Sequence, residues 1–309
     1  MLTKDTLLVL CNYLDKSDIL KLRLVFRKFE YILFIKSIET TIFDYYDALL
    51  FIMYELREKS RDLTKHIKKI KFDNDNSKHF QNLKKTFSNL TYLNFGDNFN
   101  KKISKGDLPD SLEYLIFGKH FDQPIKRGDL PSSLKLLTFG DYFDKQLKKG
   151  DLPNSLIELN FGIYFDKMII NGVLPNSLKY LTVGYCNDPE RVHKSIYFDK
   201  KTLPKLLTHL TLGPFVDIPI DKGVLPNSLT HLTFGDNFNQ EIYYIGVLQN
   251  SLIYVSFGVL FDQQITQGKL PISLKKLNIR RMKNTNYYIY NWNEIKLSKT
   301  IEVEIIITN

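Results

Sequence analysis

A short string of residues returns along most of this chain at an almost constant spacing. The leucine that opens each string of the type Leu-Pro-x-x-Leu recurs in steps of 22, 22, 22, 29, 22, 23 and 22 residues, at Leu108, Leu130, Leu152, Leu174, Leu203, Leu225, Leu248 and Leu270, with Gln249 in place of proline in the string at Leu248. A fixed period of roughly 20–29 residues is typical of a solenoid, whose coils pack only against their neighbours. The spacing predicts a repeat solenoid with about 9–10 coils of 22 residues.

The glycines follow the same rhythm. All 15 of them fall at two phases of the repeat. One phase follows the strand-like pattern Leu-x-Phe, as at Gly118 and Gly140, and the other precedes Leu-Pro, as at Gly106 and Gly128. Glycine is favoured where φ is positive or where two backbones approach closely. Each coil is therefore expected to turn twice, once after a strand and once before the next Leu-Pro.

The segment 112–130 shows how one coil can bury its apolar residues. Leu115 and Phe117 fall on one face of a strand, and Tyr114 and Ile116 on the other, because side chains alternate along a strand. Phe121 and Ile125 recur in most coils as Phe143 and Leu147, Phe165 and Ile169, Phe238 and Ile242, and Phe261 and Ile265. About six positions per coil then point inward. Parallel pairing of strands from successive coils is expected, with a return leg that is extended or contains one short turn.

The repeat resembles the FNIP repeat family, which occurs in social amoebae and in giant DNA viruses that infect amoebae. The strings "FNQEI" at 238–242 and "FDQPI" at 121–125 carry this resemblance, which extends over 86–279. It implies a leucine-rich-repeat-like parallel β-sheet. Residues 66–85 are interpreted as a leading coil, and 280–309 as a C-terminal cap that includes an alternating strand at 301–308.

The N-terminal residues lack the repeat and have a helical pattern. Residues 1–36 resemble an F-box, on the matches Leu2, Asp5, Leu7, Leu8, Tyr13, Leu14, Asp18, Ile19 and Val25, with Thr3 where proline is usual and Phe29 where tryptophan is usual. The resemblance implies that a Skp1-like adaptor, and through it a cullin, binds at Leu7, Leu8, Leu14, Ile19 and Val25. The alternative is a helical cap that only shields the first coil. Residues 37–65 are expected to form a connecting helix.

The sequence offers no arrangement typical of an enzyme. None of the six histidines belongs to an HExxH motif, and no CxxC motif, phosphate-binding loop or Ser/His/Asp arrangement occurs. We therefore expect neither catalysis nor a cofactor. The Asp or Asn that follows the recurrent Phe, as at Asp122 and Asp144, could form a metal ladder, but a hydrogen bond to its own turn is the expected role.

The charge and the cysteines limit the compartment and the partners. The formal charge is +9, and because the Lys-, Asn- and Ile-rich composition is that of an AT-rich genome, only weak, non-specific nucleic-acid binding is expected. Two distant cysteines, Cys11 and Cys186, indicate a reducing compartment. No signal peptide or membrane span is recognised. A cytoplasmic protein is expected, in the host cytoplasm if it is viral.

In one outward column of the predicted sheet the residue type changes from coil to coil, whereas the inward columns stay nearly constant. It precedes the strand leucine and contains Tyr92, Tyr114, Tyr180, His209, His231 and Tyr254, which we interpret as a face that binds an unknown target protein. An ordinary solvated sheet is the alternative. The long step within 185–204 predicts a polar loop that either joins this face or is neutral. The sequence thus favours a substrate-recruiting adaptor of a Skp1-cullin-F-box ubiquitin ligase, with a non-catalytic scaffold or decoy as the alternative and a nucleic-acid-binding solenoid as a third reading.

Overall fold

A computed structural model of the 309-residue chain describes residues 68–72, 83–184, 198–242, 244–263, 265, 268–282 and 301–308. The F-box-like segment 1–36, with its five expected adaptor contacts, and the connecting helix 37–65 fall outside the described residues. So does most of the long-step loop, at 185–197.

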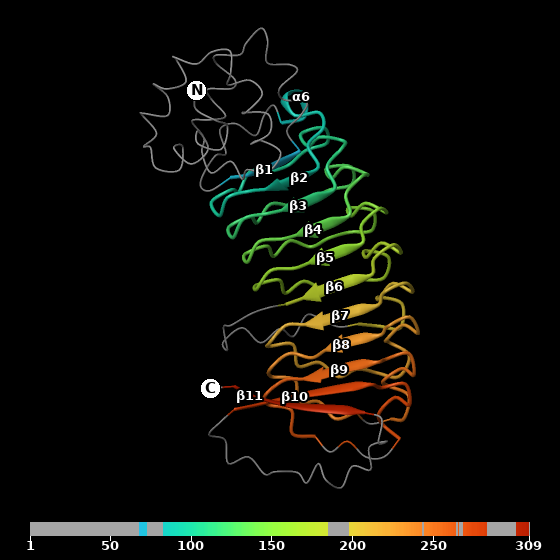
Figure 1. The fold of residues 1–309 in the computed structure, drawn as a ribbon. Coiled ribbons are helices and arrows are strands. Elements are labelled where there is room, and N and C mark those ends of the chain that lie inside the picture. Colours follow the sequence, from blue (N-terminus) through green and yellow to red (C-terminus); the bar gives the residue numbers. More distant parts are fainter. Residues whose placement is uncertain are drawn as a thin grey trace, which may run out of the picture.

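Strands of successive coils form one sheet of eleven strands, and their order in space is their order in the sequence. Every pair of neighbouring strands is parallel, so the sheet runs down one side of a tall stack (Figure 1). The strands are β1 (Lys69–Lys71), β2 (Tyr92–Asn94), β3 (Tyr114–Ile116), β4 (Leu136–Thr138), β5 (Glu158–Asn160), β6 (Tyr180–Val183), β7 (His209–Leu212), β8 (His231–Thr233), β9 (Tyr254–Phe257), β10 (Lys276–Met282) and β11 (Glu302–Thr308). The predicted parallel solenoid of 22-residue coils is confirmed.

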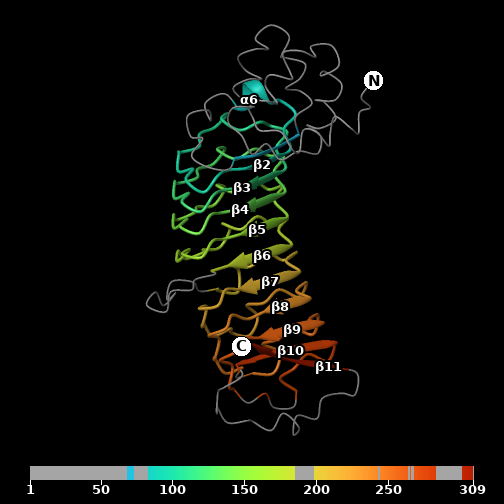
Figure 2. The ribbon, with the colours of Figure 1, turned by 60° about the vertical axis from the view of Figure 1, so that its left-hand side comes forward.

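The return legs consist of turns and extended backbone (Figure 2). The short helix α6 (Leu83–Thr86), between β1 and β2, is the one helix of the described residues. None of the described helical segments has the length and apolar composition needed to cross a bilayer.

The repeat keeps its register through the whole sheet. Equivalent residues lie opposite one another, as Leu115 does with Leu137. The long step leaves this register unchanged, because Tyr180 of β6 lies opposite His209 of β7 across 29 residues of sequence.

The core is built from the six inward positions that the repeat predicts. In the coil of β3 these are Leu108, Leu112, Leu115, Phe117, Phe121 and Ile125, and each is at most 3% exposed. The two Phe columns stack on each other and along the solenoid: Phe117 lies 3.8 Å from Phe121 and 5.8 Å from Phe139, between ring centroids. Stacked aromatic pairs contribute about 0.5–1.5 kcal/mol each beyond the burial of their area.

The two glycine phases serve two different needs, with the exception of Gly184, which follows β6 and has a φ of +66°. Gly128, which precedes Leu-Pro, has a φ of +87°, in the left-handed region that other residues rarely adopt. Gly140, which follows a strand, lacks a positive φ but has no room for a side chain. A Cβ placed there would lie 1.8 Å from the carbonyl oxygen of Gly118 in the preceding coil.

The Asp or Asn after the recurrent Phe does not bond to its own turn, so that expectation is wrong. Asp122 Oδ1 accepts a hydrogen bond from the backbone N–H of Asp144, at 2.9 Å, and Asp144 Oδ1 accepts one from Asp166, at 3.0 Å. Asn100, Asp217 and Asn239 do the same. The short side chain reaches the next coil because successive coils lie about 4.8 Å apart. This Asp/Asn ladder links the coils from Asn100 to Asp166 and those from Asp217 to Asp262.

Serine residues form a second ladder between coils. Ser133 Oγ donates to the carbonyl oxygen of Leu112, and Ser155 Oγ to that of Leu134, both at 2.6 Å. Equivalent bonds start from Ser111, Ser177, Ser228, Ser251 and Ser273. The serine of the repeated string is therefore explained by a carbonyl group of the preceding coil.

At the last coil of the repeat, Arg280 stands where the preceding coils have a glycine after the strand. This residue lies inside β10, and its Nη1 atom is 2.8 Å from Asp236 Oδ1. The expected strand at 301–308 is β11, which pairs with β10 along seven residues. Val303 and Ile305 of β11 remain 40% and 56% exposed, so this last described strand leaves apolar side chains uncovered.

Candidate functional site

The first residue of each strand from β2 onward lies on the outward face of the sheet. The six residues predicted to bind a target all occupy this position: Tyr92, Tyr114, Tyr180, His209, His231 and Tyr254. Tyr114 and Tyr180 are exposed, and the other four are partly exposed. The residue that follows each of them points inward and is buried, as the alternation along a strand requires.

These six residues form two groups. Tyr180, His209, His231 and Tyr254 stack in a continuous row, with ring centroids 4.6, 4.2 and 5.6 Å apart. We call this row the Tyr/His ladder. Tyr92 and Tyr114 lie 6.4 Å apart and form a separate pair. Leu136 of β4 and Glu158 of β5 lie between the two groups. The sequence predicted one column, and the structure brings four of its members into direct contact.

Threonines fix the tautomer of both imidazole rings. Thr208 Oγ1 donates its single hydrogen to the carbonyl oxygen of Lys179, at 3.0 Å, and lies 2.9 Å from His209 Nδ1. Since a hydroxyl group has one hydrogen, His209 Nδ1 must be the donor in the second contact. Thr230 holds His231 in the same way, with its hydrogen on the carbonyl oxygen of Thr208. Both Nε2 atoms therefore keep an acceptor lone pair.

The ladder favours neutral imidazoles. Burial lowers the pKa of His209, and the nearby His231 lowers it further, because two imidazolium charges would repel each other. Burial also lowers the pKa of His231. The rings stack almost face to face, with an interplanar angle of 9°. At neutral pH the ladder is thus an uncharged strip whose ring edges carry hydrogen-bonding atoms.

A second outward column beside the ladder is polar and uncharged. It contains Thr182, Thr211, Thr233, Ser256 and Asn278. Asn278 Nδ2 donates to the hydroxyl group of Tyr254, at 3.0 Å, and so fixes the last ring of the ladder. Ser256 and Asn278 are buried, so the accessible part of this column consists of Thr182, Thr211 and Thr233. There the surface combines aromatic area with hydroxyl groups, a composition found in protein–protein interfaces.

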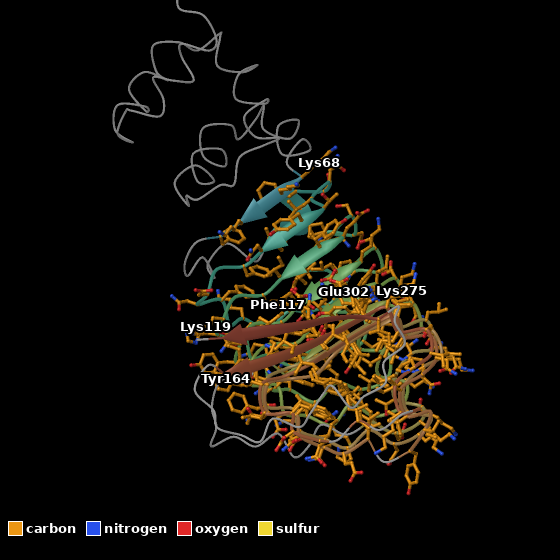
Figure 3. The ribbon with its side chains drawn as sticks, turned by 60° about the horizontal axis from the view of Figure 1, so that its bottom comes forward. Lys68, Phe117, Lys119, Tyr164, Lys275 and Glu302 are labelled. Atoms are coloured by element: carbon orange, nitrogen blue, oxygen red, sulfur yellow. The ribbon has the colours of Figure 1, made fainter. Side chains whose placement is uncertain are left out.

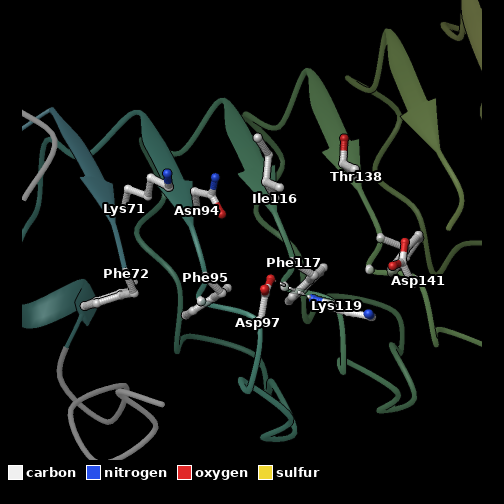
Figure 4. Close-up of a pocket in the computed structure, with 14 residues that line it drawn as sticks. Lys71, Phe72, Asn94, Phe95, Asp97, Ile116, Phe117, Lys119, Thr138 and Asp141 are labelled. Atoms are coloured by element: carbon white, nitrogen blue, oxygen red, sulfur yellow. Dashed lines mark hydrogen bonds between the residues drawn. The ribbon is translucent and has the colours of Figure 1, made fainter. Parts of the chain in front are cut away.

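A shallow concavity of about 510 Å³ lies at the other end of the sheet, over the carboxyl ends of β1 to β4. Figure 4 shows the outward side chains of Lys71, Asn94, Ile116 and Thr138 along one side of it. Asp97, Lys119 and Asp141 line the opposite side. The mixture of charges and its open shape fit a surface that a macromolecule contacts better than an enclosed site for a small molecule.

A third aromatic row was not predicted from the sequence. His120 and Tyr142 have ring centroids 5.1 Å apart, and Tyr142 and Tyr164 lie 4.9 Å apart. The signal was present in the sequence, because each of the three directly precedes the recurrent Phe-Asp. Tyr142 is 41% exposed, so this row adds an aromatic strip at the turn after the strands.

The described residues contain no group of three or more His, Cys, Asp and Glu side chains that could hold a metal ion. Asn100, Asp122 and Asp144, which belong to the alternative metal ladder, instead accept hydrogen bonds from backbone N–H groups of the next coil. What the surface offers is a rigid face with aromatic and hydroxyl groups in register.

The fold and this face define a non-globular repeat protein of the parallel β-solenoid class, an architecture that suits protein binding. The chain belongs to the FNIP repeat family: the model described as "FNIP Repeat" matches residues 59–120, 121–162, 143–186, 197–237, 217–259 and 238–281. No curated protein matches the chain.

The solved structure described as "The crystal structure of CroV588 a novel circular LRR protein structure" is similar to this chain. The two are 30% identical, and the match covers 79% of this chain and 43% of that one, with a TM-score of 0.48. The chain thus spans less than half the length of that protein.

Proposed function

We propose that this protein is a substrate-recruiting adaptor, which holds a target protein on the outward face of its sheet and carries it to a Skp1-cullin-F-box type ubiquitin ligase. The observation that supports target binding is the Tyr/His ladder, with four rings in contact on a single face. The protein itself performs no catalysis in this proposal. It brings the target close to a ligase assembled elsewhere.

The ladder has properties that favour binding. Its side chains are anchored on strands, and the imidazoles are further fixed by Thr208 and Thr230. Little conformational entropy is then lost when a partner binds, and this preorganisation favours affinity. Tyrosine is enriched among the residues that dominate interface energies. Because both Nε2 atoms are acceptors, a target that presents N–H or O–H groups fits this strip.

The link to a ligase is supported by the sequence alone. Leu7, Leu8, Leu14, Ile19 and Val25 occupy the apolar positions of the F-box pattern. In the proposal they bind a Skp1-like adaptor, which contacts a cullin. The alternative is a non-catalytic scaffold or decoy, whose N-terminal residues only cap the solenoid. Both versions place the protein in the cytoplasm and use the same outward face.

One pull-down series distinguishes the two versions. The full chain, a Leu8→Asp/Leu14→Asp variant and a Tyr180→Ala/His209→Ala/His231→Ala variant are used as baits in amoebal lysate. The adaptor predicts that the first variant loses the Skp1-like protein but keeps the target, and that the second loses the target but keeps the Skp1-like protein. Tyr142→Ala, an exposed ring outside the ladder, is the matched control. A full chain that captures a target and no Skp1-like protein would support the scaffold.

Nucleic acid is not proposed as a specific partner, although basic side chains do form a column. The side chains of Lys105, Arg127 and Lys149 each lie over the glycine of the next coil, within about 3.3–3.6 Å of the position of a Cβ there. We predict weak binding to a fluorescent DNA or RNA duplex that falls steeply as salt rises, because exposed lysines release counterions without reading bases. Submicromolar binding that resists salt would contradict this prediction.

A further inference from the structure

The turns that precede the Leu-Pro strings line up along the stack and form one edge of the solenoid. In one column of these turns, the side chain of each residue lies over the glycine of the next coil, with its nearest carbon 3.3–3.8 Å from the position of a Cβ there. The members of this column are Lys105, Arg127, Lys149, Lys200, Lys222 and Ile245. We call the two residues before the glycine of each coil, together with Asp199–Lys201 at the equivalent place, the pre-Leu-Pro edge.

The pre-Leu-Pro edge is basic over most of its length. Lys105, Lys126, Arg127, Lys148 and Lys149 are exposed in three successive coils. Lys200, Lys201 and Lys222 are exposed further along the same edge. None of these eight side chains forms an ion pair with another described residue. Figure 3 shows side chains that end in nitrogen projecting outward from the coils, as expected when aliphatic stems lie along a surface and charged ends reach the solvent.

Acidic residues neutralise only part of this charge. Asp107, Asp129 and Asp151 follow the glycine and are buried or half-buried. Each of them accepts a hydrogen bond from the backbone N–H three residues earlier, at 2.7–2.8 Å, so their carboxylates are held by the turn. Asp199 and Asp221 are exposed on the edge itself. The exposed charge of the edge is therefore strongly positive.

Exposed apolar side chains interrupt the cations on the same edge. Ile170 takes the place of Lys126 and Lys148 in its coil and is 47% exposed. Tyr244 and Ile245 are 64% and 68% exposed, in a turn that has one residue more than the turn before Gly128. Large apolar side chains that stay uncovered within a rim of charge mark a surface that another body contacts.

We propose that the pre-Leu-Pro edge binds the surface of an anionic lipid membrane. The lysines and Arg127 contact the negatively charged headgroups, and Ile170, Tyr244 and Ile245 enter the boundary between headgroups and acyl chains. Basic residues attract a protein to anionic lipid, and apolar residues on the same face add buried area, so the two together give reversible peripheral binding. Tyrosine suits this boundary because its ring is apolar and its hydroxyl group is polar.

The apolar residues favour a membrane over a nucleic acid as the partner. A phosphate backbone offers no apolar surface to Ile170 or Ile245, and binding to single strands relies on rows of aromatic rings, of which the described part of this edge has only Tyr244. The edge is also a line of side chains repeated at the coil spacing, and such a line can contact a flat surface along its whole length. Nucleic acid is therefore the alternative outcome of the test.

The test is co-sedimentation of the full 309-residue chain with lipid vesicles. Vesicles of phosphatidylcholine that contain about one third phosphatidylserine should bind the wild type at least about tenfold more tightly than vesicles of phosphatidylcholine alone, and sodium chloride should weaken this binding. Arg127→Glu/Lys149→Glu should weaken it at least about tenfold. Lys119→Glu/Lys179→Glu makes the same change in net charge at exposed lysines outside the edge, of which Figure 3 labels Lys119, and should have a much smaller effect.

A second pair of variants tests the apolar contribution. Tyr244→Ser/Ile245→Ser should weaken binding to the anionic vesicles by at least about threefold, because less apolar area enters the membrane. Tyr142→Ser/Leu260→Ser, at two 41% exposed side chains that follow the strands, is the matched control and should bind as the wild type does. Binding of the same proteins to a fluorescent DNA duplex should not depend on Tyr244 and Ile245.

Circular dichroism shows whether each variant remains folded. If Arg127→Glu/Lys149→Glu does not fold, Arg127→Gln/Lys149→Gln removes the charge but keeps part of each stem over the glycines, and it is expected to weaken vesicle binding as well. A wild type that binds neither kind of vesicle, or both equally, overturns the proposal. So does a duplex that displaces the protein from the anionic vesicles, or binding that the apolar variant leaves unchanged. The edge shares no residue with the Tyr/His ladder, so the pull-down can fail without affecting this result.

Discussion

The two faces of the same short strands differ in how much their residues vary from coil to coil. The inward positions repeat almost without change: Leu115, Leu137 and Leu159 occupy one column, and Phe117, Phe139 and Phe161 occupy the next. The outward column changes from Tyr to Leu, Glu and His along the same strands. An inward side chain must fill the space left by two neighbouring coils, whereas an outward one meets only its two neighbours and the solvent. The variable face is therefore where one FNIP array can differ from another.

The inward face should be the most sensitive to substitution. Phe143 is fully buried and stacks on Phe139, Phe121 and Phe165. Phe143→Ala is expected to lower the free energy of unfolding by about 3–5 kcal/mol, because it removes these contacts and leaves a cavity. Denaturant unfolding followed by circular dichroism measures the loss. The adjacent Tyr142→Ala, on an exposed ring, should cost much less, and equal losses would contradict the division between the faces.

The glycines that follow the strands should rank second. Gly140→Ala places a Cβ 1.8 Å from the carbonyl oxygen of Gly118, so the neighbouring coil must move. We expect a loss of about 1–3 kcal/mol, as for other overpacked sites. Gly106→Ala is the matched control, since its Cβ would meet no atom within 4 Å and only its positive φ is strained. Thermal unfolding of the two variants gives the comparison, and a larger effect at Gly106 would show that strain, not packing, dominates.

The Asp/Asn ladder lies on the return legs that follow the strands, and its effect on stability should be intermediate. Asp144→Ala leaves the N–H group of Asp166 and the Nζ atom of Lys167 without their carboxylate partner. The expected loss is about 1–2 kcal/mol, in the range for bonds to charged groups. Asp110→Ala removes an ion pair of an 80% exposed side chain and should cost less than about 1 kcal/mol. Chemical denaturation of both variants decides whether the ladder is structural.

The outward face should show the smallest effect on stability, visible mainly as a dependence on pH. The pKa values of His209 and His231 are lowered in the fold, so the unfolded chain binds protons more readily. Their contribution is complete above the unfolded pKa of about 6.5 and decreases as the pH falls below it. Thermal unfolding between pH 7.5 and pH 5 should show this slope. The double variant His209→Gln/His231→Gln should reduce it.

The sequence contained enough information for the core and for the direction of side chains. A period of 22 residues with alternation inside each strand identifies Leu115 and Phe117 as inward and Tyr114 as outward, without knowledge of the coil spacing. It did not predict the contacts between coils. The side chain of Asp122 bonds to the next coil because equivalent residues lie close together, a distance that the sequence alone does not contain.

The details of the candidate site could not be predicted from the sequence for the same reason. The column of Tyr and His was visible, but the tautomer of His209 depends on Thr208 and on a carbonyl group 29 residues earlier. Such relations arise from stacking, and local patterns in a single sequence do not encode them.

The two ladders between coils also have a mechanical consequence. Most coils are joined to a neighbour by a serine hydroxyl group, an Asp or Asn side chain and a short stretch of sheet. In a solenoid each coil contacts only its neighbours. Because distant coils do not stabilise one another, unfolding can begin at either end and advance coil by coil. A molecule pulled along its long axis would then lengthen in steps of about 22 residues, one coil at a time. The array would unfold sequentially and not as a single cooperative unit.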